Sequence, residues 1–201
     1  MEHERSSRLS MLQVFLRAFR GGPGLVDVRS ASSSAQSAAA GLWLLIGLLF
    51  VAGGTAGSSP DNSAVLVFAM FPLVEAALLF IVLLAGQFLA GRGGFHPGRL
   101  AYAAGLTVGV QSVGLGIGIY FVFLAVNSST AAMLAPVFIL EGIVTSAVML
   151  YAALVNVLEW RNGAALWFSG IVLTVALGAS IFLWAQLFAD SLPEWDAMMF
   201  L

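Results

Sequence analysis

The chain has 201 residues, of which 60% are apolar and only 9% are charged, and its mean hydropathy is +0.99. Soluble domains carry about 25% charged residues, so this composition excludes a water-soluble globular protein and predicts one embedded in a membrane. The formal charge of −2 is too small to indicate nucleic-acid binding. With no cysteine and two widely separated histidines, His3 and His96, we expect no metal site and no bound cofactor.

The polar N-terminal segment, residues 1–35, contains one stretch of helical periodicity at residues 8–20. Its apolar side chains recur at i, i+3, i+4 and i+7, which predicts an amphipathic helix lying in the membrane surface. The arginines on its other faces would then meet anionic lipid. Packing of the same apolar face on a neighbouring protein, or on the chain's own loops, is an equal alternative. The residues concerned are Leu12, Phe15, Leu16 and Phe19 on the apolar face, and Arg8, Arg17 and Arg20 elsewhere.

Five later stretches are long and apolar enough to cross a membrane. A spanning helix needs about 20 apolar residues to cross about 30 Å of hydrocarbon. The stretches are apolar on every face, whereas barrel strands would alternate in polarity over about ten residues. We therefore predict an all-α fold, a bundle of five spanning helices at residues 36–57, 64–90, 101–126, 131–158 and 164–189, followed by a short acidic tail at residues 190–201.

The eight arginines all fall on one side of this five-span arrangement. They lie in the N-terminal segment, in the loop between the second and third spans, and in the loop between the fourth and fifth. Because cytoplasmic loops are enriched in Lys and Arg, we expect a cytoplasmic N-terminus and a C-terminus on the opposite side. The use of arginine alone, with abundant alanine and glycine, favours a GC-rich bacterial genome. This predicts location in the inner membrane, with a periplasmic C-terminus.

Three polar residues fall near the middle of predicted spans. Glu75 lies about 16 Å along its helix from Ala64, Glu141 lies about 15 Å from Ala131, and Gln111 reaches a similar depth from the other side. A charge at this depth costs at least about 2.5–3.5 kcal/mol, so we expect both glutamates to be at least partly protonated and to face partners. They could form one proton or cation site with Gln111, or each could donate a hydrogen bond that holds neighbouring helices together.

Small residues recur at four-residue spacing in two spans, which predicts close helix contacts. The sequence does not show whether these contacts form within one chain or between chains. These residues are Gly105, Gly109, Gly114 and Gly118 in the third span, and Gly170, Thr174 and Gly178 in the fifth.

Two loops resemble those of the bacterial branch of the Yip1 family, small five-span membrane proteins with a cytoplasmic N-terminus. The similar segments are residues 91–95 (GRGGF) with residues 100–103 (LAYA), and residues 158–165 (LEWRNGAA). The chain departs from the family at Gln111 and Ser112, where a proline is often found, and it lacks the acidic cytoplasmic motif of the eukaryotic members. The resemblance implies a non-enzymatic protein that works through protein contacts.

We find no sequence motif for catalysis, so we predict that the protein is not an enzyme. The sequence favours a membrane scaffold, or an accessory subunit that contacts other integral membrane proteins or further copies of itself. The alternative is a proton- or cation-coupled carrier that uses Glu75 and Glu141.

Overall fold

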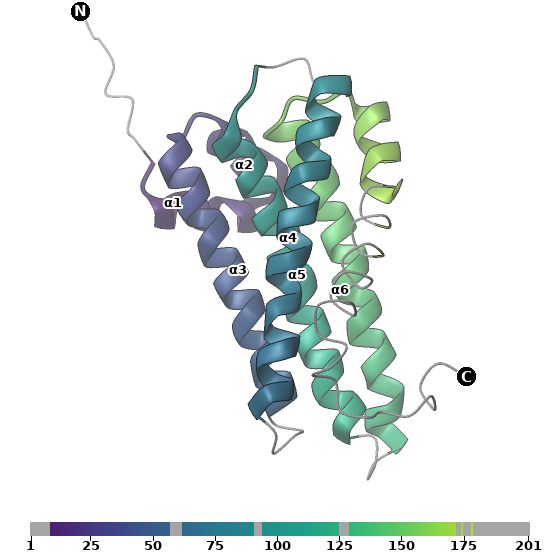
Figure 1. Ribbon diagram of the computed structural model, residues 1–201. Helices are drawn as coiled ribbons and strands as arrows, with labels where there is room; N and C mark the ends of the chain where they lie inside the picture. The colour runs from purple at the N-terminus through teal and green to yellow at the C-terminus, as the bar shows by residue number, and fades with distance from the viewer. Residues whose placement is uncertain are drawn as a thin grey trace, which may run out of the picture.

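The computed structural model describes residues 9–56, 62–90, 94–124 and 129–171, together with residues 174 and 178. In these residues the regular structure is entirely helical, and four helices are long and apolar enough to cross a membrane. These four helices lie side by side and alternate in direction (Figure 1). They are α3 (Ser33–Ala56), α4 (Asn62–Ala90), α5 (Pro97–Leu124) and α6 (Ser129–Asn156).

The fifth predicted span is only partly described. Residues 162–171 are helical, but most of the remainder of the predicted span 164–189, and the whole tail 190–201, lie outside the described residues. The structure therefore contains an all-helical bundle with four of the expected spanning helices.

Local chemistry sets where two of the helices begin. Before α3, the hydroxyl of Ser32 accepts a hydrogen bond from the backbone N–H of Ala35 at 3.3 Å, so the helix begins earlier than the apolar run alone predicts. α5 begins at Pro97, because proline has no N–H to leave unsatisfied in the first turn of a helix.

α5 is the central helix, and glycines let its neighbours approach closely on two sides. A methyl group at Gly109 would lie only 2.5 Å from the carbonyl oxygen of Trp43 in α3, and one at Gly114 would lie 2.5 Å from Cα of Gly142 in α6. Backbones that approach this closely gain dispersion contacts in a lipid environment, where apolar burial alone does not drive helices together.

The four glycines predicted in α5 therefore contact helices of the same chain. Gly105 and Gly109 pack on α3, while Gly114 and Gly118 pack on α6. Gly170 and Gly178 are exposed, and no atom of the described residues lies within 4 Å of a methyl group placed at either.

The N-terminal segment forms a helical layer across the bundle near the end at which α3 begins (Figure 1). It consists of α1 (Met11–Arg17), a 3-10 turn (Ala18–Arg20) and α2 (Gly21–Arg29). α1 begins with a capping box, in which Ser10 and Gln13 each accept a hydrogen bond from the other's backbone N–H.

The apolar face predicted for residues 8–20 is divided between two environments. Phe15 is buried with Val14 and Ala18 in the core beside α3, and the hydroxyl of Tyr102 in α5 lies 3.4 Å from the carbonyl oxygen of Val14. The other predicted apolar residues, Leu12, Leu16 and Phe19, are exposed, Phe19 to 68%. The segment thus packs on the chain's own bundle with one side and presents apolar side chains outward with another.

Candidate functional site

A chain of buried polar side chains connects three of the spanning helices at mid-depth. Nε2 of Gln111 in α5 donates a hydrogen bond to Oε1 of Glu75 in α4 at 2.9 Å. Oε1 of the same glutamine lies 3.3 Å from the hydroxyl of Ser146 in α6, whose single proton is shared between this oxygen and the carbonyl oxygen of Ile143 at 2.8 Å. Glu75 and Ser146 are each 0% exposed, and Gln111 is 3% exposed. The glutamine therefore links α4 to α6 through α5.

Glu75 lies near the centre of its helix, about 20 Å from Asn62 and about 22 Å from Ala90. Its second carboxyl oxygen, Oε2, is buried without a hydrogen-bond partner in the described structure. A carboxyl group in this position can hold neighbouring helices together through hydrogen bonds that lipid cannot replace. The predicted proximity of Glu75 and Gln111 is thus present.

The structure does not bring Glu141 to this pair. Glu141 is exposed on α6, and its carboxylate lies 3.4 Å from the hydroxyl of Thr145, one turn further along the same helix. The inward-facing Ser146 is five positions further along the helix, so at 3.6 residues per turn the two side chains point about 140° apart. The expected three-residue site of Glu75, Gln111 and Glu141 is therefore not assembled, although the three residues lie at comparable depths.

Glu141 instead lines a groove of about 370 Å³ between the N-terminal layer and three spanning helices. The wall contributed by the N-terminal layer and α3 carries three aromatic rings. The ring centroids of Phe15 and Trp43 are 4.5 Å apart, and those of Phe19 and Trp43 are 5.4 Å apart. Other lining residues are apolar apart from Thr145. We refer to this hollow, with Phe15, Phe19 and Trp43 on one side and Glu141 and Thr145 on the other, as the Glu141 groove.

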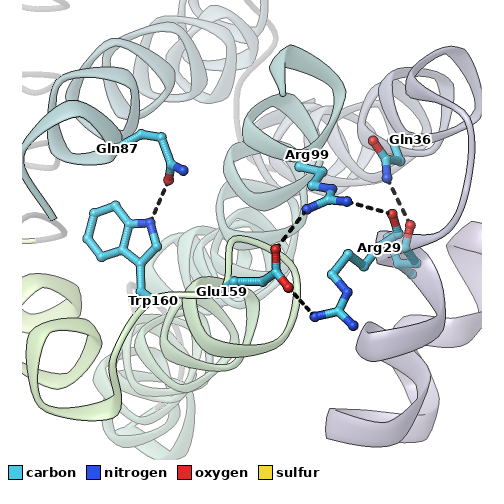
Figure 2. A network of polar contacts seen from close by, with 7 residues as sticks. Arg29, Gln36, Gln87, Arg99, Glu159 and Trp160 are labelled. Atoms are coloured by element: carbon cyan, nitrogen blue, oxygen red, sulfur yellow. Dashed lines mark hydrogen bonds and ion pairs between the residues drawn. The ribbon is translucent and has the colours of Figure 1, made fainter. Parts of the chain in front are cut away.

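An ion-pair network joins the N-terminal layer to the bundle at the arginine-bearing end (Figure 2). The carboxylate of Glu159, in the turn after α6, pairs with Arg29 of α2 and, at 3.4 Å, with Arg99 of α5. Arg99 also donates to the backbone carbonyl of Arg29 at 3.1 Å. In this turn, after the end of α6 at Asn156, Glu159 has a positive φ of 60°, a conformation that is unusual for a residue with a Cβ.

Two further contacts close the same end of the molecule. Nε2 of Gln36 donates to the carbonyl oxygen of Val28 at 2.8 Å, and Nε1 of Trp160 donates to Oε1 of Gln87 at 2.6 Å (Figure 2). The second bond connects the turn after α6 to the end of α4. Both are buried, so they fix the N-terminal layer and residues 162–171 beside the bundle.

The arginines predicted to meet lipid have different environments. Arg17 is partly buried and forms an ion pair with Asp27 of α2, whereas Arg20 is exposed. Arg8 lies outside the described residues.

Sequence reasoning missed Ser146, Glu159 and the aromatic wall of the groove. Ser146 is a polar residue in an apolar helix, a signal that the sequence did carry. The groove needs the N-terminal layer folded against α3, which no local pattern reveals. Within the described ranges, no three His, Cys, Asp or Glu side chains are grouped so that they could hold a metal ion.

Comparison with known proteins identifies no relative of this chain. No protein-family model, curated protein or solved structure matches the chain.

Proposed function

We propose that the protein is a membrane-embedded helical scaffold, or an accessory subunit, that binds another integral membrane protein through the outward face of α6. The observation that carries this proposal is the position of Glu141. It lies about 18 Å from Ser129 and about 22 Å from Asn156, and so near the centre of a spanning helix, yet it is exposed. A carboxyl group facing lipid at this depth is unfavourable, and such residues are normally covered by a polar partner.

The residues around Glu141 on the same face of α6 are large and apolar. Val137, Leu140 and Val144 are 57%, 61% and 53% exposed. We call these residues, with Val148, the α6 ridge. A spanning helix of another protein can lie along this ridge and supply a hydrogen-bond donor to Glu141.

The inner polar residues give less support to the carrier alternative. Glu75 is completely buried and is held by Gln111, and Glu141 faces away from both. A shared proton site would require the two carboxyl groups to exchange protons through one cavity. The Glu141 groove does not include Glu75 among its lining residues.

A photo-crosslinking amino acid at Val144 tests the scaffold proposal. We expect a discrete protein adduct in native membranes, and we expect Glu141→Leu to reduce its yield about tenfold, the effect of losing about 1.4 kcal/mol of binding free energy. The matched control is Ile81, which is 59% exposed on α4 and should give no such adduct. Equal adducts at both positions, or a yield at Val144 that Glu141→Leu leaves unchanged, would contradict the proposal.

We further propose that the chain crosses a bacterial inner membrane five times, with the arginine-bearing end in the cytoplasm. In support, Arg29, Arg99 and Arg161 of the described residues lie at the end where α3 and α5 begin and α6 ends. The loop similarity to the Yip1 family points to the same arrangement.

Reporter fusions after Leu201 test this orientation. We expect a C-terminal alkaline phosphatase fusion to be active, because this enzyme folds only after export from the cytoplasm. A C-terminal green fluorescent protein fusion should be dark, because that protein becomes fluorescent only in the cytoplasm. The opposite pair of results would place the C-terminus in the cytoplasm and contradict the proposed orientation.

A further inference from the structure

The Glu141 groove has the chemistry of a site for a cationic group. Its carboxylate has one hydrogen-bond partner of its own chain, the hydroxyl of Thr145 at 3.4 Å, among the residues that the structure describes. No described arginine forms an ion pair with it. Arg17 pairs with Asp27, while Arg29 and Arg99 pair with Glu159. In the described structure Glu141 therefore has no cationic partner from its own chain.

The opposite wall of the groove is suited to the same kind of group. Phe15, Phe19 and Trp43 form one cluster, with ring centroids 4.5–5.7 Å apart. The faces of aromatic rings carry negative electrostatic potential and attract an ammonium or guanidinium group within about 6 Å. This attraction is strongest where water is excluded, as at this depth in a membrane.

The surroundings of the groove favour a helix as the carrier of that cation. Glu141 lies in the middle of the α6 ridge, four residues after Val137 and three residues before Val144. From Val137 to Val148 the ridge extends about 16 Å along α6, or three helical turns. A small organic cation would need only the groove, whereas a helix packed along the ridge can also place one long side chain beside Glu141.

We infer that the Glu141 groove receives a lysine or arginine side chain from the middle of a transmembrane helix of the partner protein. This inference rests on the proposed function and specifies the chemistry of the partner. A second copy of this chain does not fit, because the sequence has no lysine and all eight arginines lie outside the predicted spans. Within a membrane, the attraction between two opposite charges offsets part of the free-energy cost of burying each of them.

Binding of a synthetic helix tests the inference directly. The full chain is reconstituted in phosphatidylcholine vesicles with a fluorescent leucine-rich transmembrane peptide of about 20 residues that has one central lysine. Association is measured by energy transfer to a dye at a single cysteine introduced in place of Ser63, since the chain has no cysteine of its own. We expect the lysine peptide to bind at least about tenfold more tightly than the same peptide with leucine in place of lysine.

Variants of the groove locate the binding. Glu141→Gln and Phe19→Ala should each weaken association of the lysine peptide about threefold to tenfold and leave that of the leucine peptide unchanged. Ile81→Ala, on the outward face of α4, is the matched control and should have no effect. Circular dichroism and size-exclusion chromatography of each variant verify folding, and Phe19→Ala, at an exposed residue, keeps the test usable if Glu141→Gln fails to fold.

Equal binding of the lysine and leucine peptides would overturn the inference. Tight binding of tetraphenylphosphonium, a lipophilic cation without a helix, would in that case show that the groove takes a small cation instead of a helix. If crosslinking at Val144 still depends on Glu141 and gives an adduct with another membrane protein, but the lysine peptide is not preferred, the inference fails while the scaffold proposal stands. Absence of any protein adduct at Val144 in the unmodified background would contradict the scaffold proposal itself.

Discussion

Replacing Glu75 with alanine is expected to lower the free energy of unfolding of the bundle by about 2–4 kcal/mol. The substitution removes a completely buried side chain from between α4 and α5 and leaves Nε2 of Gln111 without its acceptor. Glu75→Gln keeps an acceptor oxygen at the same place, so it should cost less than about 1 kcal/mol. Unfolding of the purified protein by sodium dodecyl sulfate in mixed micelles, followed by circular dichroism, measures both values.

Glu141→Ala is the matched control for this experiment. It removes the same side chain from a similar depth, but from the outward face of α6. Because the one hydrogen bond of Glu141 in the described structure is long, at 3.4 Å, and joins it to Thr145 of the same helix, the free energy of unfolding of the isolated chain should change by no more than about 0.5 kcal/mol. Similar losses for Glu75→Ala and Glu141→Ala would show that the hydrogen bond between Glu75 and Gln111 does not hold α4 and α5 together.

Replacing Gly114 with alanine should destabilise the bundle by about 1–3 kcal/mol. The added methyl group would lie 2.5 Å from Cα of Gly142 and 2.8 Å from the carbonyl oxygen of Phe138, both of which are backbone atoms. Neither can move without separating α5 from α6. The same unfolding measurement in mixed micelles detects the change.

Gly53→Ala provides the comparison for Gly114. Gly53 lies within α3, and a methyl group there would have no atom of the described residues within 4 Å. Alanine is the better helix former by about 1 kcal/mol, so this substitution should be neutral or stabilising. If Gly114→Ala is no more harmful than Gly53→Ala, the close approach of α5 and α6 does not contribute to stability.

The sequence predicts the spanning helices well because their length and apolarity reflect the thickness of the bilayer. Residues 64–90 and 131–158 were expected to span, and α4 and α6 occupy nearly the same ranges. Depth along a helix follows from the rise per residue, which is why Glu75 and Gln111 were expected at one level and do meet.

Rotation about the helix axis is the information that the sequence does not contain. An apolar helix in lipid has no polar face to mark its outside, so the direction of Glu141 could not be inferred from its neighbours. The same limit applied to the glycines of α5, whose spacing predicted close contacts but not which helices they would contact. The groove depends on Phe15 and Trp43, residues of separate elements that are brought together only by tertiary packing.

The ion pairs of Glu159 have a consequence for how the chain is assembled during synthesis. Arg29 is 130 residues away from Glu159, and all four described spanning helices are made between them. The N-terminal layer therefore leaves the ribosome before the bundle does, but the ion pair between Arg29 and Glu159 can form only after α6 has been synthesised. Until then its apolar side chains cannot pack on the complete bundle, which favours their transient adsorption to the nearby lipid surface.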